Sequence, residues 1–112
     1  MKRYGLIGKT LSHSFSKGYF TKKFDTEGIK ASYENFELDK IEKIQKVFQM
    51  SDLFGLNVTI PYKEAIIPYL DRLDPIAESI GAVNTVRLFN GQTIGYNTDV
   101  IGFENSLKPF LE

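Results

Sequence analysis

Segments of strand length alternate along this chain with segments of helical periodicity, and this alternation limits the folds that the chain can adopt. Apolar or alternating runs at residues 4–7, 32–38 and 56–60 predict strands. Between them, apolar side chains recur at helical spacing, with Gly28 expected to end the first helix and Asp39 expected to cap the second. Such an alternation predicts an α/β protein in which most strands are parallel.

The C-terminal half adds an antiparallel pair to this pattern. Asn90-Gly91 is a strong signal for a hairpin between strands at residues 83–89 and 92–96. Three further helices are predicted, at residues 61–70, 76–80 and 100–112. The expected fold is therefore a three-layer α/β sandwich with a mostly parallel mixed sheet and one antiparallel hairpin, formed as one domain by residues 1–112.

The composition excludes several functional classes. Fourteen basic residues balance fourteen acidic ones, so the chain lacks the basic excess that a nucleic-acid-binding protein normally has. With no cysteine and a single histidine, a disulfide framework and a cysteine- or histidine-rich metal site are both excluded. The apolar run after the charged N-terminus is too short for a signal peptide, so a cytoplasmic protein without membrane contact is expected.

Four short motifs contain the candidate functional residues, and the first opens the first predicted helix. Ser14 and Ser16 would either cap that helix or offer hydroxyl groups, beside backbone N–H groups at the helix start, to a carboxylate. Gly5 and Gly8, which precede this loop, do not form the G-x-G-x-x-G pattern of a dinucleotide-binding loop. No cofactor-binding residue and no metal ligand is therefore predicted in this chain.

The second motif, NVTIPYK at residues 57–63, crosses a strand end and the start of a helix. The helix dipole disfavours a cation in the first turn, so Lys63 is either a solvated surface residue offset by Glu64 or a functional group. Thr59, at the C-terminal end of the predicted strand, would cap the helix or face a ligand.

The third motif is GAVNT at residues 81–85 and the fourth is NTD at 97–99. Asparagine is depleted in strands, so Asn84 would satisfy a turn or offer both a donor and an acceptor to a ligand hydroxyl. Asp99 would cap the final helix or pair with a lysine in handling a proton.

Taken in order, these motifs resemble the substrate domain of the shikimate dehydrogenase family. The resemblance rests on five segments spread over nearly the whole chain: GLIG at 5–8, HSFS at 13–16, NVTIPYK at 57–63, GAVNT at 81–85 and NTDVIG at 97–102. It implies an NADP-dependent oxidoreductase that reduces 3-dehydroshikimate to shikimate in the shikimate pathway, on the route to chorismate and the aromatic amino acids.

The resemblance also implies a role for each candidate residue. In the family the two serines hold the substrate carboxylate, the threonine, lysine and asparagine contact its ring hydroxyls, and the aspartate pairs with the lysine. The implied substrate-binding residues here are Ser14, Ser16, Thr59, Lys63, Asn84 and Asp99. Lys63 and Asp99 would be the catalytic pair, because hydride delivery to a ketone leaves developing negative charge on an oxygen that also needs a proton.

Part of the family pattern is missing from these residues. Lys17, Phe20 and Thr21 stand where the family usually has the pattern S-P-x-x-H-N. The family continues into an NADP-binding Rossmann domain, with a glycine-rich loop and a further substrate-binding glutamine, and neither feature is recognisable in these 112 residues. NADP is therefore expected in the full-length enzyme but not in this chain, which alone would be inactive.

Other interpretations stay open. A quinate/shikimate dehydrogenase domain is the nearest alternative. A stand-alone hydroxy-acid-binding module without turnover is a second, although such a module has no need of the Lys63 and Asp99 pair. The expected partner is a small-molecule substrate, and homodimerisation through the apolar residues Phe110 and Leu111 is also open.

Overall fold

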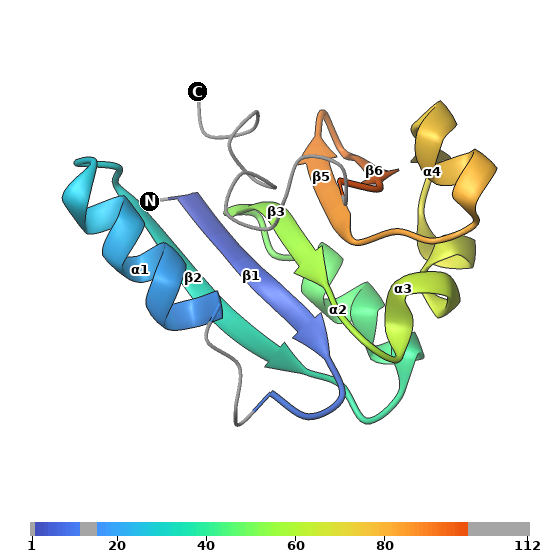
Figure 1. Ribbon diagram of the computed structural model, residues 1–112, viewed down its shortest axis with the longest axis horizontal. Helices are drawn as coiled ribbons and strands as arrows, with labels where there is room; N and C mark the ends of the chain where they lie inside the picture. The colour runs from blue at the N-terminus through green and yellow to red at the C-terminus, as the bar shows by residue number, and fades with distance from the viewer. Residues whose placement is uncertain (1, 12–15, 99–112) are drawn as a thin grey trace.

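The computed structural model describes residues 2–11 and 16–98, in which six strands form one mixed sheet in the order β2-β1-β3-β5-β6-β4 (Figure 1). The strands are β1 (Lys2–Gly8), β2 (Ala31–Glu37), β3 (Leu53–Val58), β4 (Arg72–Leu73), β5 (Thr85–Phe89) and β6 (Gln92–Tyr96). β1 pairs in parallel with β2 and β3, and β4 pairs in parallel with β6. β5 runs antiparallel to β3 and β6, so the predicted mostly parallel sheet with one hairpin is confirmed.

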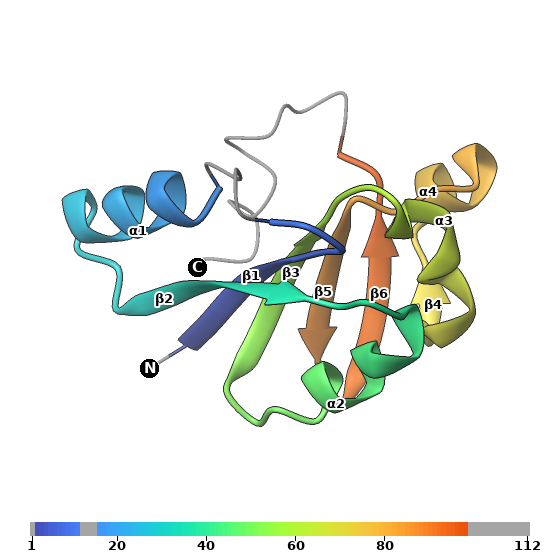
Figure 2. The ribbon, with the colours of Figure 1, turned by 90° about the horizontal axis from the view of Figure 1, so that it is seen from below.

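Helices cover both faces of this sheet. They are α1 (Ser16–Thr26), the 3₁₀ turn η1 (Ile41–Lys43), α2 (Ile44–Phe48), α3 (Tyr62–Ala65), the 3₁₀ turn η2 (Ile67–Tyr69) and α4 (Pro75–Ile80). Figure 2 shows α1 and α2 on opposite faces of the sheet. Because side chains alternate along a strand, β1 sends Tyr4 and Leu6 into the core under α1 and Ile7 into the core under α2. The predicted three-layer arrangement is thereby confirmed.

The core under α1 is aromatic. Phe20 is fully buried and stacks on Tyr33 of β2, with ring centroids 4.7 Å apart and planes 20° apart. Phe24, one turn further along α1, packs against Tyr4 of β1 with centroids 5.7 Å apart. Burying each of these rings contributes roughly 1.5–3 kcal/mol, so the aromatic spacing that predicted α1 also fixes the helix on the sheet.

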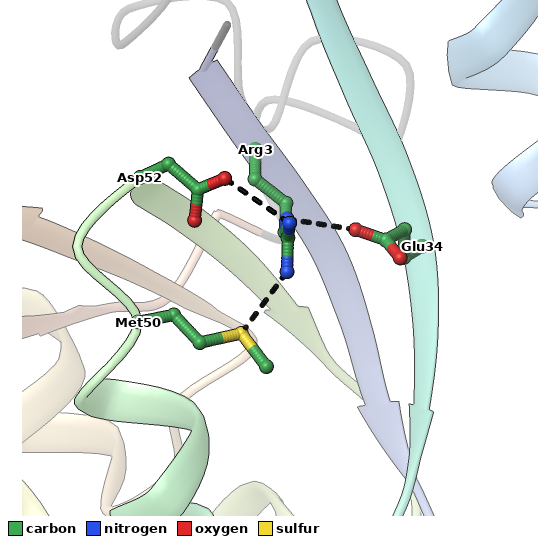
Figure 3. Close-up of polar contacts among 4 residues, drawn as sticks. All are labelled: Arg3, Glu34, Met50 and Asp52. Carbon is green, nitrogen blue, oxygen red and sulfur yellow. Dashed lines mark hydrogen bonds and ion pairs between the residues drawn. The ribbon is translucent and has the colours of Figure 1, made fainter.

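A group of polar contacts around Arg3 links the strands at the end of the sheet where β1 begins (Figure 3). Arg3 forms ion pairs with Glu34 of β2 at 2.9 Å and with Asp52, just before β3, at 3.1 Å. Its guanidinium also donates to the sulfur of Met50 at 3.4 Å, and its backbone N–H donates to the Asp52 carbonyl at 2.8 Å. These half-exposed ion pairs contribute at most about 1 kcal/mol each, but together they connect β1 to both of its neighbours.

Several predicted elements differ in detail from the structure. The second helix is divided into η1 and α2, and the prediction that Asp39 caps it was wrong. Asp39 instead forms an ion pair with Lys43 at 2.7 Å, which lowers the pKa of its carboxyl group. β3 lies earlier than predicted, and β4, a two-residue edge strand, was not predicted. The helix predicted at residues 100–112 lies outside the described residues.

The predicted hairpin turn is confirmed at Asn90 and Gly91. Both have positive φ angles, 52° and 75°, as a two-residue turn with the twist of a β-hairpin requires. The chain leaves α1 through Gly28 and α4 through Gly81, whose φ angles are also positive.

Candidate functional site

The candidate motifs meet at the edge of the sheet where the parallel strands β1, β3 and β6 end. The Thr59 N–H donates to the carbonyl of Ile7 at 2.9 Å, which joins the end of β3 to the end of β1. The Val58 N–H donates to the Asn84 carbonyl at 2.8 Å, and the Asn84 N–H donates to the Tyr96 carbonyl at 3.0 Å. Backbone hydrogen bonds therefore bring the NVTIPYK and GAVNT motifs together with the end of β6, which directly precedes the NTD motif.

Lys63 lies in the first turn of α3, as predicted, and its side chain is half-buried. Its carbonyl accepts a hydrogen bond from the Val83 N–H at 2.7 Å, so the lysine backbone is tied to the GAVNT segment. Among residues 2–11 and 16–98, no acidic side chain forms an ion pair with Lys63, and Glu64 is exposed beside it. Asp99, the partner predicted for Lys63, lies outside the described residues, as does Ser14.

Gly5 and Gly8 have packing roles, and within the described residues they leave no open phosphate-binding space beside β1. A Cβ atom at Gly8 would lie 2.5 Å from a methyl carbon of Leu11 and 2.7 Å from the methyl carbon of Thr59. A Cβ atom at Gly5 would lie 2.5 Å from the Glu34 carbonyl oxygen. Side chains of the protein fill the space that a pyrophosphate would need beside Gly8, so these residues do not fit a nucleotide cofactor.

Ser16 is the first residue of α1 and belongs to a buried hydrogen-bond network. Its side chain hydrogen-bonds the hydroxyl of Tyr33, which in turn donates to Oδ1 of Asn57 at 2.8 Å. All three residues are at least 95% buried. Burial raises the pKa of Tyr33 well above its ordinary value, although the hydrogen bond with Ser16 lowers it in part. The network links the start of α1 to the NVTIPYK motif through β2.

Replacing Tyr33 with Phe is expected to make the fold less sensitive to alkaline pH. Above the ordinary tyrosine pKa of about 10, the unfolded chain releases a proton that the folded chain keeps, so the free energy of unfolding falls as pH rises. One such tyrosine contributes a slope of about 1.4 kcal/mol per pH unit, and Tyr33→Phe should remove it. Urea unfolding of both proteins between about pH 9 and about pH 11.5 measures the two slopes. Equal slopes would contradict the raised pKa.

Asn84 is held by a second network. Its Oδ1 atom accepts a hydrogen bond from the Thr98 N–H at 2.9 Å, and the hydroxyls of Thr98 and Thr85 both lie 3.1 Å from it. The structure thus accounts for the unexpected asparagine, because β5 begins at Thr85 and Asn84 precedes the strand. The prediction that the strand starts at residue 83 was wrong by two residues.

Four of these network residues were not predicted from the sequence as site residues: Tyr33, Asn57, Thr85 and Thr98. Asn57, Thr85 and Thr98 stand within motifs, adjacent to or two positions from a predicted site residue, and that proximity could have found them. Tyr33 carries no such signal, because it lies in a different strand and only the parallel pairing of β1 with β2 brings it near.

The described residues contain no group of three or more histidine, cysteine or acidic side chains that could hold a metal ion. None of the helices within residues 2–11 and 16–98 is long and apolar enough to cross a membrane.

Solved structures of shikimate dehydrogenases have the same fold. Shikimate dehydrogenase 1 of Peptoclostridium difficile superposes with a TM-score of 0.85 at 41% identity, over 97% of this chain and 41% of that one. Shikimate 5-dehydrogenase of Thermus thermophilus, solved in complex with NADP(H) and shikimate, superposes with a TM-score of 0.82 at 34% identity, over 97% and 42%. These similarities confirm the α/β class.

Curated relatives of similar sequence are also named shikimate dehydrogenase. The shikimate dehydrogenase (NADP(+)) of Staphylococcus epidermidis is 42% identical over an alignment of 112 residues, and this alignment covers 98% of this chain and 42% of the relative. The Aquifex aeolicus protein of that name is 43% identical over an alignment of 110 residues, which covers 96% of this chain and 41% of the relative. The chain therefore spans well under half the length of either relative.

The family described as the shikimate dehydrogenase substrate binding domain matches residues 6–86. The matched segment includes the last three residues of β1, all of β2 and β3, and the NVTIPYK and GAVNT motifs, whose strands and loops form the site described above. On the evidence of the motifs, the fold and the relatives, the chain belongs to the shikimate dehydrogenase substrate-binding domain family.

Proposed function

We propose that this chain binds the substrate of an NADP-dependent shikimate dehydrogenase and holds 3-dehydroshikimate while it is reduced to shikimate. The main support for the proposal is that backbone hydrogen bonds bring Thr59, Lys63 and Asn84 together at the end of the sheet where β1, β3 and β6 stop. Relatives that bear this enzyme's name, and the Thermus thermophilus structure that contains shikimate, support the choice of substrate.

In this proposal the start of α1 holds the substrate carboxylate. Ser14 and Ser16 would provide hydroxyl groups beside the N–H groups of the first helical turn, where the helix dipole also favours an anion. The link from Ser16 through Tyr33 to Asn57 ties the start of α1 to the motif that carries Lys63, and Ser16 would turn its hydroxyl proton from Tyr33 to a bound carboxylate. A substrate fixed at both ends is held in one orientation for the reaction.

Lys63 is proposed as the residue that stabilises and protonates the reacting oxygen. Negative charge develops on a ketone oxygen during its reduction, and a lysine ammonium group nearby both offsets that charge and supplies a proton. Asp99 would orient Lys63 and favour its charged form. The half-buried position of Lys63 supports this role, since partial removal from water strengthens the interaction with a developing charge.

The chain is assigned no part in holding NADP, because the residues around Gly5 and Gly8 do not fit it. NADP would supply the hydride within the complete enzyme. We therefore expect the 112-residue chain to bind shikimate without catalysing its oxidation. A cytoplasmic location for the complete enzyme is part of the same proposal.

A two-dimensional amide NMR titration of the chain with shikimate tests the proposed function. We expect selective shifts at Ser14, Ser16, Lys63, Asn84 and Asp99, and none at Asn90 or Gly91, which form a turn at the opposite end of β5. Quinate, titrated in parallel, measures selectivity. Addition of NADP to the shikimate-bound chain should produce no NADPH absorbance. A well-dispersed spectrum that shikimate leaves unchanged would contradict binding by this chain.

A further inference from the structure

We propose that Thr85 is a positioning residue that holds the side-chain amide of Asn84 so that its N–H₂ half meets the ligand. The inference rests on the proposed function, in which Asn84 contacts the substrate. It concerns whether the C=O or the N–H₂ half of the Asn84 amide contacts the ligand, and which residue fixes the orientation of that amide.

The acceptor half of the Asn84 amide is used inside the protein. Oδ1 lies 2.9 Å from the Thr98 N–H nitrogen, 3.1 Å from the Thr98 hydroxyl and 3.1 Å from the Thr85 hydroxyl. The two hydroxyl oxygens are 3.2 Å from each other. Every donor in this set belongs to the protein and is fixed by the ends of β5 and β6.

A count of protons shows that this acceptor is fully occupied. The hydroxyls of Thr85 and Thr98 have two protons between them for three contacts. Either both hydroxyls donate to Asn84 Oδ1, or one hydroxyl donates to the other and that second hydroxyl donates to Asn84 Oδ1. In each arrangement Oδ1 accepts the Thr98 N–H and at least one hydroxyl. A carbonyl oxygen has two lone pairs, so none remains for a ligand. The ligand oxygen opposite Asn84 must therefore accept a hydrogen bond from it.

Thr85 is the better fixed of the two hydroxyl-bearing residues. It is fully buried, and in the sheet it pairs with Asn57 on one side and Tyr96 on the other. Thr98 lies two residues beyond the end of β6. A threonine hydroxyl in such a site must be hydrogen-bonded, since burying it without a partner is costly. The sheet thus fixes Thr85, and Thr85 helps to fix Asn84 and Thr98.

The first test needs no ligand. ¹⁵N relaxation of the Asn84 side-chain amide in the chain should indicate an ordered group in the unmodified protein. Its order should fall in Thr85→Val, which keeps the shape and removes the hydroxyl, and should return in Thr85→Ser. Thr93→Val is a matched control, because Thr93 is also a buried strand threonine but bonds Asp71 instead. Unchanged order in Thr85→Val would overturn the inference.

The second test is a double-mutant cycle of shikimate affinity, measured by the same NMR titration. Thr85→Val should weaken binding roughly three- to tenfold, since the Thr98 hydroxyl can still serve Oδ1. In an Asn84→Ala background the same change should have no further effect, because Thr85 acts through Asn84. Equal losses in both backgrounds would overturn the positioning role. If Asn84→Ala itself binds normally, the substrate contact proposed for Asn84 fails instead, and the relaxation result still decides whether Thr85 orders the amide.

Discussion

Lys63→Ala is expected to lower kcat by roughly 10²- to 10⁴-fold in the complete dehydrogenase proposed above, with a much smaller change in KM for shikimate. The substitution removes the group proposed to neutralise and protonate the substrate oxygen, an interaction that strengthens as charge develops. The proposed carboxylate contacts at Ser14 and Ser16 remain, so ground-state binding is largely kept. Steady-state kinetics over a range of shikimate concentrations separates the two effects.

Two control variants make this prediction specific. Lys63→Arg keeps the positive charge but replaces the proton donor by a group that does not release a proton, so binding should be kept while kcat still falls. Lys46→Ala removes an exposed lysine from α2, on the sheet face opposite α1, and should leave both parameters unchanged. An unaltered kcat in Lys63→Ala would exclude Lys63 from the chemistry.

The position of Lys63 in the first turn of α3 illustrates what sequence reasoning could predict. A lysine in the first turn of a short helix breaks a local electrostatic preference, and the five ordered motifs made that exception interpretable. The strands were predictable because β1 and β3 are buried on both faces and therefore read as apolar runs. The Asn90-Gly91 turn was predictable because few residues accept two successive positive φ angles.

The parts that could not be predicted depend on contacts between distant segments. Tyr33 looked like an ordinary strand aromatic, and only the stacking of Phe20 and the pairing of β2 with β1 place its hydroxyl beside Ser16 and Asn57. Asp39 had the residue type of a helix cap, but its ion pair with Lys43 and the division of that helix into two turns were decided by local geometry. Residue type predicts a candidate role, and tertiary packing selects among such roles.

Gly5→Ala is expected to destabilise the fold by roughly 1–3 kcal/mol, whereas the same change at Gly18 should stabilise it by roughly 0.5–1 kcal/mol. At Gly5 the added methyl group would lie 2.5 Å from the carbonyl oxygen of Glu34, its partner in the β1–β2 ladder, and would press on the ring of Phe36. A backbone oxygen held by strand pairing cannot move aside as a flexible side chain can. Gly18 lies within α1, where a Cβ atom meets no other atom within 4 Å.

Urea denaturation of the two variants beside the unmodified chain measures both effects, and equal m-values would confirm that only stability has changed. The two changes in the free energy of unfolding have opposite signs because their causes differ. Gly5→Ala destabilises the fold through steric overlap, whereas Gly18→Ala stabilises it because alanine has less backbone entropy than glycine in the unfolded chain. A Gly5→Ala variant as stable as the unmodified chain would contradict the packing role of Gly5.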